Sequence, residues 1–457
     1  MLKSSETGAF LKRAIRRHEV PGASFAVLRG NKIVRQAQAG TVNTDSGVPV
    51  TPDAVFQIGS ITKPLTATLV MQMVDEGLIE LDAPIVTYLP EFRVARADVG
   101  STVTVRELLS HTSGIDGDFF IDSGLGDDAI RRFLDRCAMV PSLFERGEMM
   151  SYCNLGFAVL GRLLEVMRRR SYGRVMQKHL FAPLGMDHAF ASPEQAIRFN
   201  CAIGHLPPRG RQKLWQPTRQ PYLSFGQSAA GSVPSMSAAD LLQVARLHLN
   251  LGRDPSGSRL LRTTSVRDMQ HRHIKLPRHT QVGATGWGLG WILMNWRGEP
   301  VYGHDGATIG QFAFMRIFPQ QNLAFALLTN GGRAGFLFDE VCNEIISPLV
   351  GTAAPMLPEP ARRQPSADPY VGRYGNMSTQ IDMSRRAGRL RIHRIGLESG
   401  EPLDPQPLNV TFIDRETARI DVGDEVLDRT RLFFTQFDDD GKPHYLQTGF
   451  RQFRRLT

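Results

Sequence analysis

Four prolines fall within eleven residues in the last quarter of this chain: Pro355, Pro358, Pro360 and Pro365. Proline lacks a backbone donor and fixes φ, so such a run interrupts helices and strands and is typical of a linker. Helical and strand-like apolar patterns alternate before it, and only short strand-like runs follow it. The pattern predicts a large domain over residues 1–352, a linker over 353–366 and a small β-rich domain over 367–457. A length of 457 residues agrees with one large domain plus a smaller one.

The larger domain is expected to be of the mixed α/β (α+β) class. Apolar residues recur at helical spacing in several segments, which cover residues 9–19, 62–76, 105–109, 127–137, 155–168, 238–249 and about 335–350. Residues 23–39 alternate like a hairpin, and further strand-like runs cover 287–293, 301–304, 312–318 and 323–329. Such runs suit a central antiparallel sheet flanked by helices.

Residues 367–457 contain no segment of helical period and length. Short strand-like runs occur at 390–393 and 432–435, and Asp440-Gly441 marks a turn before another. We expect a small antiparallel barrel or sandwich here.

Composition excludes several kinds of partner. The 54 Lys+Arg exceed the 45 Asp+Glu by nine charges, but no basic run is interleaved with aromatic residues, so nucleic acid is excluded. No apolar run reaches about 18 residues, and no signal-peptide core follows Lys3, so we expect a cytoplasmic protein without a membrane span. The cysteines are too irregularly spaced for a zinc site or a disulfide framework. His271 and His273 lack carboxylate partners in the sequence, and no metal or cofactor is expected.

One motif places a serine beside a lysine. In Ser60-Ile61-Thr62-Lys63, the serine and lysine lie on the same face of a helix. A serine hydroxyl needs a neighbour that accepts its proton, and Lys63 can do so when it is neutral. The arrangement predicts that Ser60 is a nucleophile with Lys63 as its base.

Two later motifs supply the remaining chemistry. Tyr152 offers a phenol that can relay a proton, and Asn154, two positions on, can fix the lysine and a substrate amide. His304 lies on a predicted strand, and Gly306 lets a substrate carbonyl approach that strand. The backbone N–H groups of Ser60 and Ala307 are candidates for an oxyanion hole. Each residue alone has an ordinary structural explanation, but the ordered set predicts an acyl-serine enzyme.

Other residues are candidates for the walls of a substrate cleft. They are the stretch 228–232, which includes Gly231, and the C-terminal arginines Arg451, Arg454 and Arg455. Ser113, preceded by His111 and followed by Asp116, has no base at an interpretable spacing, so we interpret this segment as a loop.

These motifs carry a family resemblance. Residues 56–63, 108–114, 152–156 and 303–306 resemble the conserved segments of class C β-lactamases and penicillin-binding-protein-like serine hydrolases, over about residues 10–350. The resemblance implies that Ser60 is acylated, that Lys63 and Tyr152 transfer protons and that Asn154 supports them. His304 stands where many β-lactamases and transpeptidases have a lysine, which disfavours a β-lactamase.

Within this group, the chain resembles the penicillin-binding-protein-type thioesterases. They combine such a domain with a small lipocalin-like domain, and they cyclise peptides taken from the carrier of a nonribosomal peptide synthetase. The implied substrate is a peptidyl thioester, or otherwise an ester or amide, and a peptidyl carrier protein is the implied partner. A stand-alone esterase or D-amino-acid-specific peptidase is the alternative, and a non-catalytic acyl-serine sensor or structural protein is a third. The sequence identifies neither the acyl group nor the oligomeric state.

Overall fold

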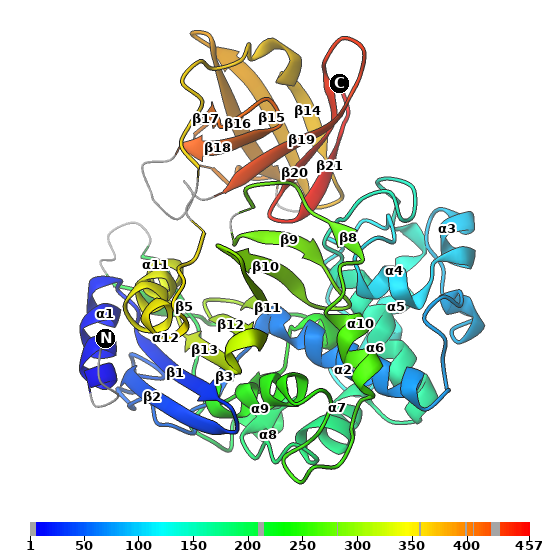
Figure 1. Ribbon diagram of the computed structural model, residues 1–457. Helices are drawn as coiled ribbons and strands as arrows, with labels where there is room; N and C mark the ends of the chain where they lie inside the picture. Colours follow the sequence, from blue (N-terminus) through cyan, green and yellow to red (C-terminus); the bar gives the residue numbers. More distant parts are fainter. Residues whose placement is uncertain are drawn as a thin grey trace.

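An eight-stranded antiparallel sheet forms the centre of the larger body in the computed structural model (Figure 1). The structure describes residues 6–208, 214–280, 282–355, 358–397, 400–404, 406–421 and 430–457. In spatial order the strands are β2 (Lys32–Gly40), β1 (Gly22–Arg29), β13 (Leu323–Thr329), β12 (Phe312–Phe318), β11 (Glu299–Ala307), β10 (Ile292–Trp296), β9 (Ala284–Trp287) and β8 (Ile274–Lys275). The antiparallel sheet predicted from the sequence is confirmed.

Burial along these strands follows their place in the sheet. Every residue of β13 is buried, because helices cover both faces of the sheet there. The edge strand β2 instead alternates between buried and exposed positions, as expected when one face meets solvent.

Twelve α-helices are present in the described part of the chain. They are α1 (Thr7–Arg17), α2 (Thr62–Asp75), α3 (Ala97–Thr102), α4 (Val105–Leu109), α5 (Ala129–Leu134), α6 (Asn154–Arg168), α7 (Tyr172–Met176), α8 (Pro193–Ala196), α9 (Ala238–Leu249), α10 (Thr263–Met269), α11 (Ala334–Val341) and α12 (Ser347–Val350). None of the helices in the described ranges is long and apolar enough to cross a membrane. The helix α6 is central to the helical half, where it packs against α2, α4, α5 and α7.

Two expectations for this body need correction. The run 287–293 is not one strand, since β9 ends at Trp287 and β10 begins at Ile292. The backbone N–H of Gly288 donates to the carbonyl of Trp291 (2.9 Å), which closes a hairpin turn. The helix expected at about 335–350 is divided by a π-helical turn at Cys342–Ile346, between α11 and α12.

The C-terminal residues form a closed barrel of eight antiparallel strands, in which each strand pairs with the next. The strands are β14 (Gly372–Gly375), β15 (Thr379–Arg386), β16 (Arg389–Gly396), β17 (Leu408–Phe412), β18 (Thr417–Asp421), β19 (Arg431–Phe437), β20 (Pro443–Thr448) and β21 (Arg451–Arg455). Closure removes the free sheet edges, and the inward-facing apolar residues make a separate core. The expected small barrel is confirmed.

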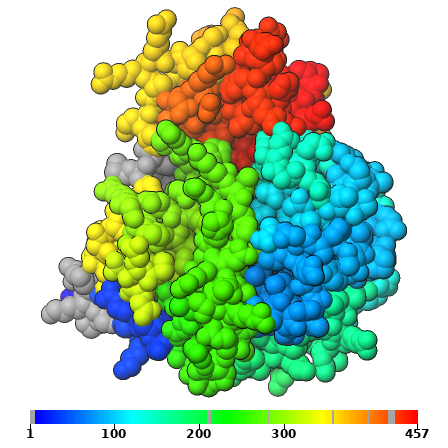
Figure 2. All heavy atoms as spheres, turned by 45° about the vertical axis from the view of Figure 1, so that its right-hand side comes forward, coloured from blue at the N-terminus to red at the C-terminus, as the bar shows by residue number. Residues whose placement is uncertain are grey.

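The barrel rests directly on the larger body. Figure 2 shows the red C-terminal strands in contact with the cyan part of the chain. Several barrel side chains contribute to this contact. Tyr445 Oη donates to the carbonyl of Leu143, while Gln447 and Gln452 both donate to that of Met150. These contacts bring the turn between β20 and β21 to the segment that begins the Tyr152 motif.

Candidate active site

Lys63 lies at the centre of the candidate site. Ser60 belongs to the 3₁₀ turn Gly59–Ile61, which continues directly into α2, so Ser60 and Lys63 share a face as expected. The fully buried Lys63 Nζ lies 3.1 Å from Ser60 Oγ, 2.8 Å from Asn154 Oδ1 and 2.7 Å from the carbonyl of Ala230. A neutral amine has two N–H bonds and one lone pair. Two donors toward Asn154 and Ala230 leave that lone pair for the hydroxyl of Ser60.

Burial also favours the neutral form of this lysine. It lowers the pKa of Lys63 well below its ordinary value, and the positive charge of Arg451 lowers it further, against the weaker opposing effects of Cys153 and Asp118. Lys63 can therefore accept the proton of Ser60.

Tyr152 lies beside this pair, with Lys63 Nζ 4.6 Å from the centre of its ring. Burial raises the pKa of Tyr152 above its ordinary value, and this effect outweighs the opposing effects of the Ser60 hydroxyl and Arg451. Tyr152 is thus a neutral phenol in the resting site. This arrangement favours Lys63 as the base and Tyr152 as a donor or relay of protons.

His304 lies across the site on β11. Its ring centroid is 6.1 Å from that of Tyr152 and 5.7 Å from that of Trp287. Burial, aided by Lys63, lowers the pKa of His304 to about 3, so the imidazole is uncharged near neutral pH. His304 therefore supplies no fixed positive charge for a substrate carboxylate.

The free end of β11 faces Ser60. Because β10 pairs with β11 only as far as Gly303, residues 304–307 extend past the end of β10 and keep one edge unpaired. A Cβ on Gly306 would lie 1.9 Å from the carbonyl oxygen of Ile58 and 3.0 Å from Ser60 N, so this close approach requires glycine. The expected oxyanion donors, Ser60 N and Ala307 N, come from these two adjoining segments.

A cleft of about 670 Å³ opens beside Ser60, and most of its lining is apolar. Its walls include Gly231, Gly306, Ala307 and Arg451, as well as Ser60, Tyr152, Asn154 and His304. The predicted catalytic and oxyanion residues thus line one cavity, apart from the buried Lys63. Aromatic and aliphatic side chains supply much of the remaining surface: Phe120, Leu223, Trp287, Ile292, Phe312, Phe314 and Phe450.

Three expectations for the walls are wrong. Arg454 is exposed, and Arg455 donates to the carbonyls of Pro369 and Val371 within the barrel, so neither lines the cleft. Ser228 lines a different cavity, of about 520 Å³.

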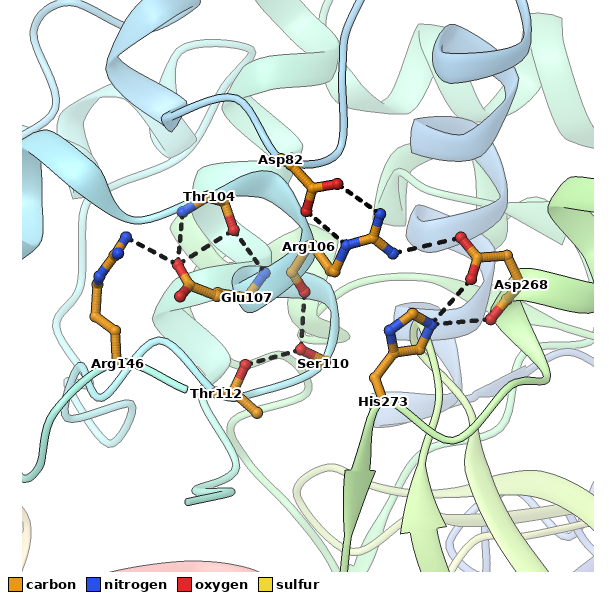
Figure 3. A network of polar contacts seen from close by, with 9 residues as sticks. All are labelled: Asp82, Thr104, Arg106, Glu107, Ser110, Thr112, Arg146, Asp268 and His273. Carbon is orange, nitrogen blue, oxygen red and sulfur yellow. Dashed lines mark hydrogen bonds and ion pairs between the residues drawn. The ribbon is translucent and has the colours of Figure 1, made fainter. Parts of the chain in front are cut away.

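The loop that precedes the Tyr152 motif is held by a polar network (Figure 3). Thr104 and Glu107 form a reciprocal capping box that begins α4, and Ser110 Oγ donates to the carbonyl of Arg106 and lies 2.9 Å from Thr112 Oγ1. Between those last two residues, His111 Nδ1 accepts from the backbone N–H of Cys153 (3.0 Å). The predicted interpretation of this segment as a loop holds, and the loop fixes the backbone on which Tyr152 lies.

Of the two histidines considered for a metal, His271 packs edge-on against His273 with ring centroids 5.6 Å apart. The expectation that neither has a carboxylate partner is wrong for His273, because Asp268 is close in sequence on the preceding helix α10. His273 Nε2 lies 3.2 Å from Asp268 Oδ1 and 3.1 Å from the Asp268 carbonyl (Figure 3). Within the described ranges, no group of three or more His, Cys, Asp or Glu side chains could hold a metal ion.

Sequence reasoning missed several residues of the site. The Ala230 carbonyl carries no sequence signal because any residue supplies one. Phe450 reaches the site only through the docking of the barrel, and Asp118 of the catalytic body gains its partner Arg451 in the same way. No sequence motif signals that docking.

Comparison with known proteins agrees with this geometry. The sequence model of the Beta-lactamase family matches residues 9–340. The chain belongs to the Beta-lactamase family. Penicillin-binding protein 4 of Amycolatopsis lactamdurans is 41% identical over 361 residues, which cover 78% of this chain and 93% of that protein. The chain is thus a β-lactamase-like member of the serine hydrolases.

Two solved structures share this fold. The crystal structure of SurE matches with a TM-score of 0.80 and 28% identity over 99% of both chains, and SurE has also been solved with D-Leu. The D-amino acid amidase of Ochrobactrum anthropi SV3 matches with a TM-score of 0.61 and 22% identity, over 76% of this chain and 97% of its own. The second likeness concerns the fold alone.

Proposed function

We propose that this protein is a stand-alone penicillin-binding-protein-type thioesterase, which releases and macrocyclises nonribosomal peptides through an acyl-enzyme on Ser60. The observation that carries the proposal is the entry of the barrel into the cleft, where Phe450 and Arg451 form one wall. Cyclisation requires a site that holds a folded peptide and keeps water from the ester. An apolar cleft closed on one side by a second domain suits that task.

The charges in the cleft support the same proposal. The neutral His304 replaces the lysine expected of a β-lactamase, and the cation in the cleft is Arg451, whose side chain is 31% exposed. A guanidinium can donate to a peptide carbonyl or carboxylate near the reacting residue. The match to SurE extends over the barrel, and the D-Leu bound to SurE suggests an apolar D-configured residue at the acylated end.

The proposed reaction has two halves. Ser60 Oγ attacks the thioester carbonyl while Lys63 Nζ takes its proton, and the N–H groups of Ser60 and Ala307 stabilise the oxyanion. The carrier thiol leaves with a proton relayed through Tyr152. The N-terminal amine of the peptide then attacks the Ser60 ester, loses a proton to the same pair, and the hydroxyl is regenerated. A peptidyl carrier protein is the proposed partner, and a substrate bound to it would require a cytoplasmic enzyme.

The proposal is tested with a peptidyl thioester of N-acetylcysteamine that ends in D-Leu and has a free N-terminal amine. The expected product is the cyclic peptide, lighter by one water than the linear acid, and Ser60→Ala should form none. The L-Leu epimer and the N-acetylated peptide are matched controls. Linear acid alone from the D-Leu substrate would reject the cyclase and retain the esterase or peptidase.

A further inference from the structure

Two buried carboxylates, Asp116 and Asp118, connect the catalytic body to the barrel. Both lie in the loop that follows α4, with exposed fractions of 1% and 6%. Asp116 Oδ2 accepts from the backbone N–H of Met377 (2.7 Å), and Asp118 Oδ2 accepts from Asn376 Nδ2 (3.3 Å). The turn between β14 and β15 is thereby attached to the catalytic loop.

Asp118 also holds a second part of the barrel, at the start of β21. Its carboxylate accepts from Arg451 Nε at 2.7 Å, while Arg451 Nη1 donates to the carbonyl of Gly449 (3.2 Å). The guanidinium carbon then lies 5.2 Å from the centre of the Tyr152 ring, within the range of a cation–π interaction. Arg451 Nη2 makes no hydrogen bond within the described ranges, and the residue lines the cleft.

An arginine side chain has several rotatable bonds, so its place over Tyr152 depends on what fixes it. A charge-assisted hydrogen bond to a buried carboxylate fixes Nε and therefore the plane of the guanidinium. Burial of a carboxylate is costly, and it is offset here chiefly by Arg451. Without Asp118, the guanidinium of Arg451 would lose the hydrogen bond that holds it beside Tyr152.

We propose that Asp118 is a positioning residue for acylation, which holds the barrel's Arg451 over Tyr152 so that the barrel forms an integral part of the reacting site. This inference rests on the proposed acyl-serine chemistry of Ser60. The loop after α4 then has a role in acylation, because its Asp118 pairs with Arg451 of the barrel.

The test is a double-mutant cycle on the full-length protein, with Asp118→Asn, Arg451→Met and the pair. The substrate is a p-nitrophenyl ester of N-acyl-D-leucine, which is expected to acylate Ser60 and release p-nitrophenol in an initial burst. The size of the burst gives the fraction of active sites, and its rate gives the acylation rate constant of an active site. We expect each single variant to lower that rate constant about tenfold, and the double variant to be no slower than the slower single one. A purely structural role would lower the active fraction and leave the rate constant for each titrated site unchanged.

The matched control is Asp404→Asn, which breaks the ion pair between Arg394 and the buried Asp404 inside the barrel. This variant should keep the wild-type rate constant. Losses that add in the double variant, or a wild-type rate constant in Asp118→Asn, would overturn the inference. A wild-type protein that shows no Ser60-dependent burst would instead reject the proposed chemistry itself.

Discussion

The backbone carbonyl of Phe450, in the turn between β20 and β21, accepts a 2.8 Å hydrogen bond from the backbone N–H of Tyr152. The Phe450 ring packs against Trp287 with a centroid distance of 5.5 Å, and Trp287 in turn lies 5.8 Å from the Tyr152 ring. A barrel residue thus helps to fix the backbone of a catalytic motif nearly three hundred residues earlier in the chain. The domain that carries Ser60 and Lys63 does not complete this site by itself.

Loss of the Phe450 ring should therefore damage catalysis. Phe450→Ala keeps the carbonyl but removes the packing that places it, and we expect Ser60 acylation to slow by about ten- to a hundredfold. Phe437→Ala is the matched control, since Phe437 is also a half-buried barrel ring but packs against Tyr370 and Arg415. Both should lose about 1–3 kcal/mol of stability. Equal rates for the two variants in a stopped-flow acylation assay would contradict this account.

The protonation state of Lys63 should set the pH dependence of acylation. Since burial lowers the pKa of Lys63 and the base must be neutral, kcat/KM should rise with pH along a limb centred well below pH 10.5. His304, with a pKa of about 3, should add no limb between pH 5 and 8. Lys63→Arg should lose about 10²–10⁴-fold at every pH, because a guanidinium stays protonated. A kcat/KM that keeps rising up to pH 10.5 would show that the pKa of Lys63 is not lowered, which would contradict this prediction.

Gly231 should tolerate no side chain. Its φ is 123°, and a Cβ would lie 2.2 Å from the carbonyl oxygen of Gly59 and 2.8 Å from Ser60 N, an expected oxyanion donor. Gly231→Ala should reduce kcat by about 10²–10³-fold, the usual loss of one such donor. Gly257→Ala is the control, because Gly257 also has positive φ (90°) but nothing lies near its Cβ position. That control should lose about 1–2 kcal/mol of stability and no activity. A wild-type kcat in Gly231→Ala would show that Ser60 N is not a donor of the oxyanion hole.

Asp116 should make stability depend on pH. Burial, reinforced by Asp118, raises the pKa of Asp116 to about 6, against the opposing effects of the Met377 and Asp118 N–H groups and Arg451. The folded protein then keeps a proton that the unfolded chain releases, so stability declines as pH rises from about 4 to 6. The decline is at most about 3 kcal/mol.

Asp116→Asn removes this titration, and its amide oxygen can still accept from the N–H of Met377. The melting temperature of the variant, relative to wild type, should therefore rise by several degrees between pH 4.5 and pH 7.0. Asp382→Asn, which removes a barrel carboxylate paired with Arg373 near the surface, is the control and should show no such trend. A constant difference between Asp116→Asn and wild type would contradict a raised pKa.

Elements with clear periodicity could be predicted from the sequence. The helices 105–109 and 238–249 and the strands 312–318 and 323–329 have the predicted bounds. The helices bury residues at helical spacing, and the strands are short apolar runs separated by the turn at 319–322. The run 287–293 was misassigned because its apolar residues are buried in a turn as well as in strands. Local apolar content does not distinguish the two.

The residues of the candidate site likewise fall into those that the sequence predicts and those that it does not. Ser60, Lys63, Tyr152 and Asn154 lie in short motifs whose chemistry depends on spacing along one or two segments. Arg454 and Arg455 were placed wrongly because a strand rises about 3.3 Å per residue, which carries Arg455 about 13 Å beyond Arg451. Asp118 and Phe450 depend on how two separate cores dock, and no local pattern encodes that.

The central claim is that Ser60 forms the acyl-enzyme. Its most direct test is the intact mass of the protein after reaction with the p-nitrophenyl ester of N-acyl-D-leucine, followed by peptide mapping. The account predicts one added acyl group on the peptide that contains Ser60, and none in Ser60→Ala. Labelling that persists in Ser60→Ala, or that maps to another residue, would contradict it.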